Sequence, residues 1–206
     1  MNVIFVSNNK GKINELSALL TDFPFSVIPY TDIIKTPLSI NETGASFKEN
    51  ALIKVEAVTP FLDTSNVTII ADDSGLEIPV LHNEPGIYSA RFGGEKLTDL
   101  DRCKLILNRL DGHSDRSARL VSYVAVHLPN NTVHYTKGIL NGVISHTVDG
   151  NTGFGYDPIF IPNGFNASLA RLGPEIKNKI SHRYQSIFEA SKLISAFSAQ
   201  LMSGEK

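Results

Sequence analysis

Two adjacent carboxylates, Asp72 and Asp73, follow the apolar run at residues 67–71 and precede Ser74-Gly75. The run has the composition of a buried strand, so the pattern places two acids at the carboxyl end of a strand, before a Ser-Gly turn. An open α/β sheet binds its ligands at that edge, where two carboxylates can hold a divalent cation or orient a water as general base. An ordinary Asx turn explains this segment alone equally well.

A second polar segment, Ser7-Asn8-Asn9-Lys10-Gly11-Lys12, separates an expected strand from an expected helix. Backbone amides at a helix N-terminus, together with lysines and a hydroxyl group, suit an anion such as phosphate. The spacing of a Walker A loop is absent. Taken alone, the segment is equally typical of a solvated strand-to-helix loop.

A third polar group combines Glu42-Thr43-Gly44 with Glu49, Asn50 and Lys54. Glu42 could join the two aspartates around a cation, while Lys54 faces phosphate oxygens. Without the other motifs, a capped and solvated helix start is the better explanation of this segment.

Three later segments add groups that suit a planar, polar ligand. The first is Pro85-Gly86-Ile87-Tyr88-Ser89-Ala90-Arg91-Phe92-Gly93-Gly94, a turn followed by a candidate loop whose arginine could equally be a structural pairing residue. In Gly153-Phe154-Gly155-Tyr156-Asp157, the glycines let backbone and ring approach a ligand, although an aromatic turn in a β-rich region is the alternative. Lys177 and Ser181-His182-Arg183 precede the last helix and can donate to a carbonyl or a phosphate, although such a His-Arg pair is more often structural.

The elements that must position these groups alternate between strands and helices. The periodicity predicts strands at 3–6, 25–29, 67–71 and 76–81, helices at 12–20, 47–58, 99–110 and 184–202, and an antiparallel pair at 118–128 and 133–140. Helix 99–110 begins at a Thr or Asp cap. The β-rich middle is expected to form a second lobe within about 115–165 of a single domain that covers residues 1–206.

Composition excludes several classes of protein. A net charge of −2 over 206 residues, from 19 basic and 21 acidic side chains, argues against general binding to nucleic acid or to a membrane surface. The single cysteine, Cys103, allows neither a disulfide framework nor a thiolate zinc site within one chain, and its helical surroundings indicate a packing residue. The first residues lack a signal-peptide pattern, so we expect a cytoplasmic protein.

These motifs, in this order and over nearly the whole chain, resemble the inosine triphosphate pyrophosphatase family. The hallmarks are Ser7-x-Asn9-x-x-Lys12 with Glu15, Glu42-Thr43-Gly44, Phe47-x-Glu49-Asn50-Ala51 with Lys54, Ala71-Asp72-Asp73-Ser74-Gly75-Leu76, Pro85 to Arg91, Gly153 to Asp157, and Ser181-His182-Arg183. The resemblance implies an α/β fold with an elongated mixed sheet, flanking helices and two lobes around a central cleft, in a homodimer. It also implies Mg²⁺-dependent hydrolysis of non-standard purine nucleoside triphosphates (ITP, dITP and XTP) to the monophosphate and pyrophosphate.

The resemblance also implies roles for individual residues. Asp73 is expected to accept the proton and to bind the metal with Glu42, and the adjacent Asp72 is the further candidate metal ligand. The expected phosphate-binding residues are Ser7, Asn8, Asn9, Lys10, Gly11, Lys12 and Lys54. The expected residues around the rest of the substrate are Ser74, Phe154, Gly155, Tyr156, Asp157, Lys177, His182 and Arg183.

Base selectivity follows from hydrogen-bond chemistry. Hypoxanthine and xanthine carry a 6-oxo group, which accepts hydrogen bonds from donors such as Lys177, His182 or Arg183. The 6-amino group of adenine is itself a donor, so the same side chains would leave it badly paired. The chain departs from the family pattern at Leu169-Ala170-Arg171-Leu172, where relatives often carry an acid, and at Tyr156, which is tryptophan in some relatives.

Two other functions are compatible with parts of the sequence. A Maf-like enzyme would cleave pyrimidine triphosphates by similar chemistry, but the motifs at 153–157 and 181–183 argue against it. A nucleotide sensor that does not hydrolyse its ligand would have little need for the acidic residues beside a phosphate-binding loop.

Overall fold

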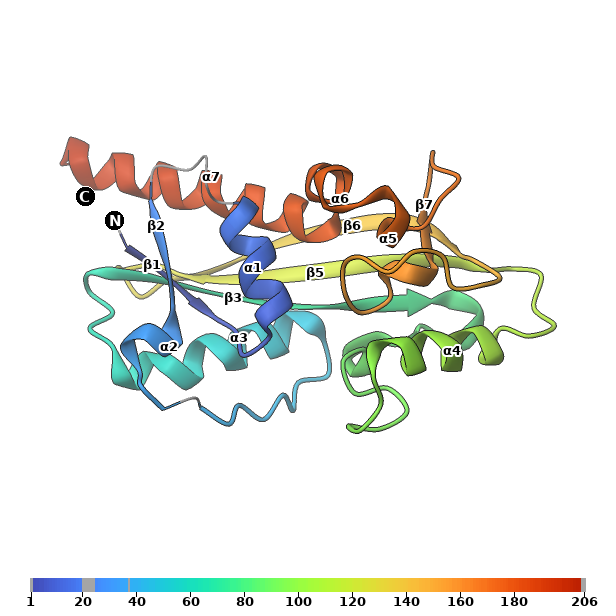
Figure 1. Ribbon diagram of the computed structural model, residues 1–206. Helices are drawn as coiled ribbons and strands as arrows, with labels where there is room; N and C mark the ends of the chain where they lie inside the picture. The colour runs from blue at the N-terminus through green and yellow to red at the C-terminus, as the bar shows by residue number, and fades with distance from the viewer. Residues whose placement is uncertain (1, 20–24, 37, 205–206) are drawn as a thin grey trace. The chain divides into compact units, whose positions relative to one another are not determined.

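The computed structural model describes residues 2–19, 25–36 and 38–204, and the strands among them form one mixed sheet (Figure 1). The strands are β1 (Asn2–Val6), β2 (Ser26–Pro29), β3 (Val67–Ile78), β4 (Glu84–Pro85), β5 (Ser117–His127), β6 (Val133–Ile144) and β7 (Phe160–Pro162). Their order is β2-β1-β3-β5-β6-β7, with β4 paired to β3. β1 runs parallel to β2 and β3, whereas β4 is antiparallel to β3 and β7 is antiparallel to β6.

Helices flank this sheet. They are α1 (Lys10–Leu19), α2 (Tyr30–Ile33), α3 (Phe47–Val58), α4 (Asp99–Arg109), α5 (Leu169–Leu172), α6 (Pro174–Ile180) and α7 (His182–Ser203). Short 3₁₀ helices are η1 (Thr59–Phe61), η2 (Pro79–Leu81), η3 (Gly86–Tyr88) and η4 (Asp157–Ile159). The expected fold class, a mixed sheet with flanking helices, is confirmed. No helix within the described ranges combines the length and apolar composition needed to span a bilayer.

The strand that carries the two aspartates is longer than expected. β3 continues from Val67 through Asp72, Asp73, Ser74 and Gly75 to Ile78, so the predicted Ser-Gly turn and the separate strand at 76–81 are wrong. Ser-Gly favours a turn only locally, and here pairing with neighbouring strands keeps the backbone extended. β1 ends at Val6, opposite Ala71, so the two aspartates lie just beyond the end of β1.

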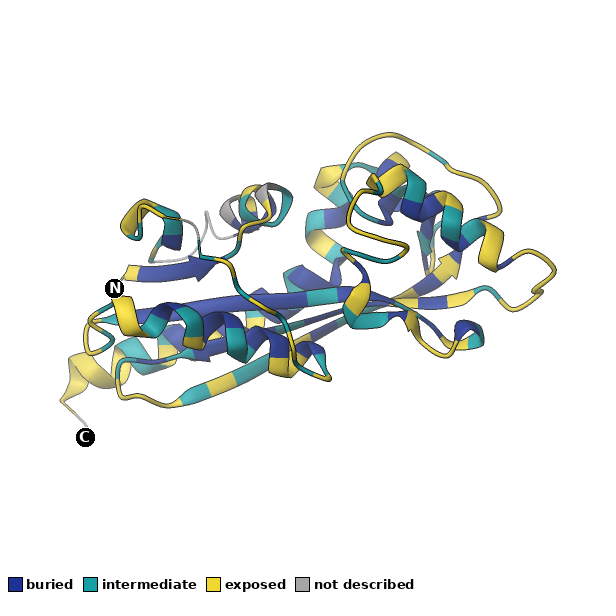
Figure 2. Cartoon of the chain, turned by 90° about the horizontal axis from the view of Figure 1, so that it is seen from below, coloured by how far each residue is buried: buried dark blue, intermediate teal, exposed yellow. Residues whose placement is uncertain are grey.

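The chain divides into two compact units. The first comprises Met1–Asp73, Ser122–Lys137 and Tyr184–Lys206, and the second comprises Ser74–Val121 and Gly138–Arg183. Buried residues follow the strands and the inner sides of the helices, and exposed residues collect on the loops and outer helix faces (Figure 2).

In the first unit, side chains alternate between two faces of β1 and β3. One face, here called the α1 face, packs against α1 and α7, and the other, the α3 face, packs against α3 (Figure 1). The α1 face contains Val3, Phe5, Ile70, Leu16, Ile187 and Ile194, and the α3 face contains Ile4, Val6, Ile69, Ala71, Ala51 and Val55. Because successive residues of a strand point to opposite sides, Asp72 continues the α1 face and Asp73 continues the α3 face.

The second unit has its own apolar core. The core combines Leu76 and Ile78 of β3 with Cys103, Ile106 and Leu110 in and just after α4. It also includes Tyr156, Ile159, Phe160 and Leu169. α4 begins with a capping box in which Thr98 and Asp101 satisfy each other's backbone N–H groups, so the predicted Thr or Asp cap is Thr98.

Most other expected elements are present with shifted ends. α3 has the predicted bounds because Ser46 caps its N-terminus and its apolar residues recur at helical spacing. α1 begins two residues earlier than predicted, at Lys10, and residue 20 lies outside the described residues. β5 and β6 are neighbours, and β6 extends beyond the predicted end at residue 140 to Ile144.

Candidate active site

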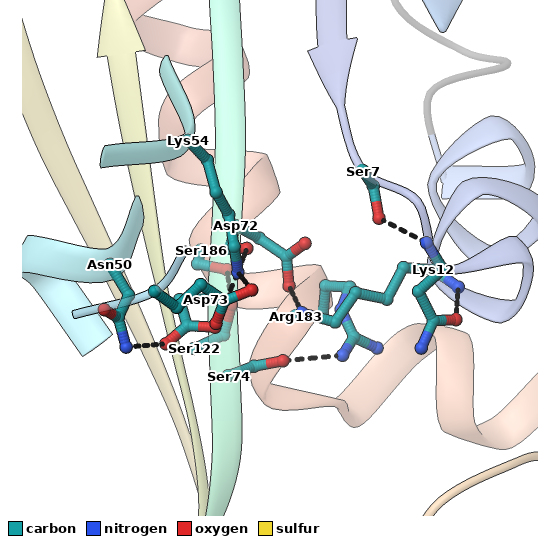
Figure 3. Close-up of polar contacts among 12 residues, drawn as sticks. Ser7, Lys12, Asn50, Lys54, Asp72, Asp73, Ser74, Ser122, Arg183 and Ser186 are labelled. Carbon is teal, nitrogen blue, oxygen red and sulfur yellow. Dashed lines mark hydrogen bonds and ion pairs between the residues drawn. The ribbon is translucent and has the colours of Figure 1, made fainter. Parts of the chain in front are cut away.

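A buried lysine lies among carboxylates in the first unit (Figure 3). The Nζ atom of Lys54 lies 2.7 Å from Oδ1 of Asp73 and 3.2 Å from Oε1 of Glu42. It also donates a 3.1 Å hydrogen bond to the backbone oxygen of Asp72. The side chains of Lys54 and Asp73 are only 11% and 7% exposed, so solvent screens this pair poorly. Two carboxylates therefore share one cationic group.

Asn50 and Lys54 approach Asp73 from the same side because they are one helical turn apart on α3. Asn50 is fully buried and donates a 3.2 Å hydrogen bond from Nδ2 to Oδ2 of Asp73. Its Oδ1 accepts a 2.9 Å hydrogen bond from the backbone N–H of Gly44. Asp73 is therefore bound on both carboxylate oxygens by α3.

The glycine in Glu42-Thr43-Gly44 permits this close approach. A Cβ atom at Gly44 would lie 2.8 Å from Oδ1 of Asn50 and 2.7 Å from Cβ of Glu49, closer than real Cβ contacts. Glu49 belongs to the helix cap, because its Oε2 accepts from the N–H of Ala45 and its own N–H donates to Ser46. The capped helix start expected as one explanation of this segment is present, and Glu42 additionally reaches Lys54.

Burial and charge shift the pKa values of this group in identifiable directions. Burial raises the pKa of the Asp73 carboxyl above its ordinary value, and the nearby ammonium groups of Lys54 and Lys12 offset this only in part. Burial lowers the pKa of Lys54, but Asp73, Asp72 and Glu42 outweigh that effect and raise it overall. The ammonium thus stays charged, while Asp73 is a stronger base than an exposed aspartate.

The α1 face carries a second acid–lysine pair. Nζ of Lys12 lies 2.9 Å from Oδ2 of Asp72, whose side chain is 1% exposed. The loop before α1 is bound internally: Ser7 Oγ accepts from the N–H of Asn9, and Asn9 Oδ1 accepts from the N–H of Lys12, each at 3.1 Å. Asp72 therefore pairs with a lysine of α1, whereas the adjacent Asp73 pairs with a lysine of α3.

The side chain of Asn8 holds this loop to the segment after α2. Its Oδ1 accepts from the hydroxyl of Tyr30, and its Nδ2 donates to the backbone oxygen of Leu38 at 3.1 Å. The N–H of Leu38 in turn donates to the Tyr30 hydroxyl at 3.0 Å. Since both ends of the Asn8 amide bind protein groups, the loop would present its backbone amides to an anion more readily than this side chain.

The second unit contains a separate group of cations and an aromatic ring. Nζ of Lys177 lies 2.6 Å from Oδ2 of Asp157 and 4.2 Å from the ring centre of Phe154. The guanidinium carbon of Arg183 lies 5.3 Å from the same ring centre. Two cations thus lie within cation–π distance of one phenyl ring.

The other predicted residues of this unit are buried or half-buried. Arg183 donates a 2.9 Å hydrogen bond to Oγ of Ser74 (Figure 3), and His182, the first residue of α7, is 4% exposed. Tyr156 lies in the apolar core, and its hydroxyl donates to the backbone oxygen of Ser89 at 2.9 Å. Tyr156 thus anchors the turn that carries Phe154.

The structure brings together some of the predicted metal ligands. Glu42 and Asp73 contact the same ammonium, whereas the Asp72 side chain pairs with Lys12 on the other face. Within the described residues, no group of three or more His, Cys, Asp or Glu side chains is arranged to hold a metal ion. The side chain of Lys10 lies outside the described part of the chain.

Sequence reasoning missed the role of Asn50 as a hydrogen-bond partner of Asp73. The available signal was its position four residues before Lys54, which places both side chains on one face of α3. The sequence gave no comparable signal for the contacts that the turn at 153–157 makes with Ser89, Asp99 and Cys103.

Comparisons with known proteins agree with these observations. The family model described as the Ham1 family matches residues 3–193. A Staphylococcus aureus protein named "dITP/XTP pyrophosphatase" is 39% identical over 204 residues, which is 99% of this chain and 97% of that protein. A Bacillus licheniformis protein of the same name is 39% identical over 194 residues, covering 93% and 97% of the two chains.

Solved structures give the same result. The structure of the Staphylococcus aureus Ham1 protein superposes with a TM-score of 0.83 at 38% identity, covering 95% of this chain and 99% of that one. A HAM1 protein from Coxiella burnetii has a TM-score of 0.82 at 34% identity, with the same coverage. Sequence and fold together show that the chain belongs to the Ham1 family.

Proposed function

We propose that this protein is a nucleotide pyrophosphatase that hydrolyses non-standard purine nucleoside triphosphates (dITP, ITP and XTP) to the monophosphate and pyrophosphate. Such an activity keeps these nucleotides out of DNA and RNA. Support comes from full-length relatives named dITP/XTP pyrophosphatase and from the buried Asp73, which carries the chemical argument. The same relatives favour this activity over a Maf-like enzyme and over a sensor.

The two polar groups differ in chemistry, and each suits one part of such a substrate. We assign the triphosphate to the first unit, where the loop at residues 7–12 and the ammonium groups of Lys12 and Lys54 provide positive charge beside Asp73. We assign the purine to the second unit, where Phe154 offers a ring for stacking and Lys177 and Arg183 offer donors. Ser74 and His182 complete the proposed lining of the purine site in the second unit.

The reaction adds water across the bond between the α phosphorus and the bridging oxygen of the triphosphate. Asp73 accepts a proton from the attacking water, the oxygen of that water bonds to phosphorus, and pyrophosphate leaves with the bond electrons. Burial makes Asp73 more basic than an exposed aspartate, and Asn50 and Lys54 hold its two oxygens in place. The lysines stabilise negative charge on the phosphates.

Mg²⁺ fits the proposed site. Glu42 and Asp73 already converge on one positive charge, and Mg²⁺ commonly uses one or two carboxylates together with substrate phosphates. When bound, the ion would supply charge neutralisation and polarise phosphoryl oxygens. Asp72 is a less direct candidate because its carboxylate faces Lys12.

Three further expectations accompany this proposal. We propose a homodimer and a cytoplasmic location on the basis of the resemblance and the composition. We also propose that residues 1–206 act as one catalytic domain, with the β-rich lobe within about 115–165. Sedimentation at several protein concentrations would test the homodimer, and cell fractionation would test the location. Comparing the activity of the intact chain with that of its fragments would test the single domain.

The decisive experiment is pyrophosphate release from ITP, dITP, XTP, GTP, ATP and dTTP, with Mg²⁺ and then with a chelator. We expect release from the first three, loss with the chelator, and a drop of about 100-fold or more for Asp73→Asn. Asp111→Asn, at an exposed position after α4, is the matched control. Preference for dTTP would identify a Maf-like activity, and tight binding without release would identify a sensor.

A further inference from the structure

Both backbone polar groups of Gly155 are bound by side chains of α4. Oδ2 of Asp99 accepts a 2.7 Å hydrogen bond from the N–H of Gly155. Sγ of Cys103 donates to the backbone oxygen of the same residue at 3.3 Å. The two α4 side chains thus hold the peptide groups on either side of one residue in the turn at 153–157.

The arrangement depends on helix spacing and on a glycine. Asp99 and Cys103 are four residues apart and so lie on one face of α4. Gly155 has φ +61°, a conformation that residues with a Cβ rarely adopt. Cys103 is fully buried, so its thiol contact is protected from water, whereas Asp99 contributes a charged acceptor from a more exposed position.

The bound residue directly follows Phe154. The N–H of Phe154 donates to Oδ2 of Asp157 at 2.9 Å, and the same oxygen accepts from Lys177 at 2.6 Å. Movement of Gly155 would therefore displace the Phe154 ring relative to Lys177 and Arg183, the two cations beside it. The position of the ring thus depends on α4 contacts that do not involve the ring itself.

We propose that Asp99 and Cys103 are positioning residues that fix Phe154 against Lys177 and Arg183, and that they thereby set affinity and selectivity for the purine base. This inference rests on the proposed function, in which the turn at 153–157 receives the base. Neither residue is expected to contact the reacting phosphates. Substitutions of these two residues should therefore change KM and the choice of base.

The kinetic test compares variants that remove or keep each contact. Asp99→Ala removes the acceptor and Cys103→Ala removes the donor, whereas Asp99→Asn and Cys103→Ser keep a group that can accept or donate. For the double alanine variant we expect KM for ITP to rise about 10-fold or more, kcat to change by less than about 3-fold, and the ITP-to-ATP ratio of kcat/KM to fall. Cys103→Ser should restore most of the loss, and Lys104→Ala, at an exposed position on α4, should behave like the wild type.

A second measurement needs no activity. The chain contains no tryptophan, so Phe154→Trp introduces a single indole at the position in question. We expect acrylamide to quench its fluorescence at least about 2-fold more strongly when Asp99→Ala and Cys103→Ala are added, because the turn becomes mobile. Lys104→Ala should leave the quenching unchanged.

The outcomes separate this inference from the proposed function. If the wild type hydrolyses ITP but the double variant keeps its KM, its base preference or its indole quenching, the positioning role is overturned. If the wild type releases no pyrophosphate from any triphosphate, the proposed function and the base-selectivity part fail together. In that case the quenching experiment still decides whether α4 fixes position 154.

Discussion

Asn50 donates a hydrogen bond of 3.2 Å from Nδ2 to Oδ2 of Asp73, on the carboxylate whose other oxygen contacts Lys54. Because Asn50 also accepts from the N–H of Gly44, it joins the proposed base to the segment that carries Glu42. We expect Asn50→Ala to lower kcat by about 100-fold, since a small misplacement of a reacting group is costly. We also expect it to lower the free energy of unfolding by about 1–3 kcal/mol, since buried groups lose partners.

Steady-state kinetics and urea denaturation of Asn50→Ala would check both expectations. Asn50→Asp keeps the shape but places a second carboxylate against Asp73, which raises the pKa of the pair. Wild-type kcat in both variants would show that Asn50 does not position Asp73.

Lys54 is expected to be essential for both stability and catalysis. Lys54→Met leaves Asp73 and Glu42 without their shared cation, and loss of one partner of a buried pair typically costs about 3–5 kcal/mol. Lys48→Met, on the exposed side of the same helix, removes a cation 4.3 Å from the Tyr135 ring centre and should cost less than about 1 kcal/mol. Urea denaturation of both variants measures the difference.

The cost of Lys54→Met should depend on pH. Burial already raises the pKa of Asp73 above its unfolded value, and removing Lys54 removes an opposing effect, so the pKa rises further. A buried carboxylate is costly only when charged, and the destabilisation should therefore be largest near pH 8 and shrink as the pH falls toward 5. A destabilisation that grows as the pH falls would contradict this account.

The contrast between α3 and β3 shows what local sequence can predict. The bounds of α3 follow from a capping serine and apolar residues at helical spacing, both of which are local signals. The continuation of β3 through Ser74-Gly75 depends on neighbouring strands that are distant in sequence, so the local turn signal gave the wrong answer.

The candidate site shows the same division between local and distant information. The adjacency of Asp72 and Asp73 is visible in the sequence, and so are the lysines that meet them. The two aspartates lie on opposite faces because the backbone of β3 is extended through them. The sequence did not predict this separation, because it indicated a turn directly after the aspartates. Cys103 was correctly expected to be buried, but only the folded chain places its thiol against Gly155.

Glu42 is expected to contribute to metal binding independently of catalysis. Mn²⁺ titration followed by electron paramagnetic resonance measures this without turnover, and we expect Glu42→Gln to weaken Mn²⁺ binding by about 10-fold or more. Glu56→Gln, at an exposed position of α3, is the control. Unchanged Mn²⁺ affinity in Glu42→Gln would remove Glu42 from the proposed ligands.

Cys103 should make the protein sensitive to alkaline pH. Burial, aided by the charges of Asp99 and Asp157, raises the pKa of its thiol from 9.0 to about 12. Between these values the unfolded thiol has lost its proton while the folded thiol keeps it, so stability falls as the pH rises. We expect thermal denaturation between pH 9 and about 11 to show a steeper decline for the wild type than for Cys103→Ser, whose hydroxyl does not titrate in this range.

An equal slope in the two proteins would show that the thiol ionises as readily in the folded state as in the unfolded one. Reaction of Cys103 with a thiol reagent gives an independent reading. The native protein should react slowly at pH 8, and the urea-unfolded protein should react at the rate of a free thiol, because burial suppresses both ionisation and access.

Lys177 and Lys179 provide a matched pair for testing base recognition. Both lie on α6, but the Lys177 side chain is 8% exposed beside Asp157 and Phe154, whereas Lys179 is exposed. We expect Lys177→Met to raise KM for ITP by about 10-fold or more and to lower the preference for ITP over ATP, because a donor suited to a 6-oxo group is lost. Lys179→Met should change neither quantity by more than about 2-fold.

A Lys177→Arg variant separates selectivity from folding. Arginine keeps the positive charge that Asp157 requires, so the variant should remain folded by circular dichroism while its donors reach different positions. If Lys177→Met and Lys177→Arg both keep the wild-type ratio of kcat/KM for ITP and ATP, Lys177 serves only to neutralise Asp157. Base selectivity would then have to come from the other donors proposed near the base, Arg183 and His182.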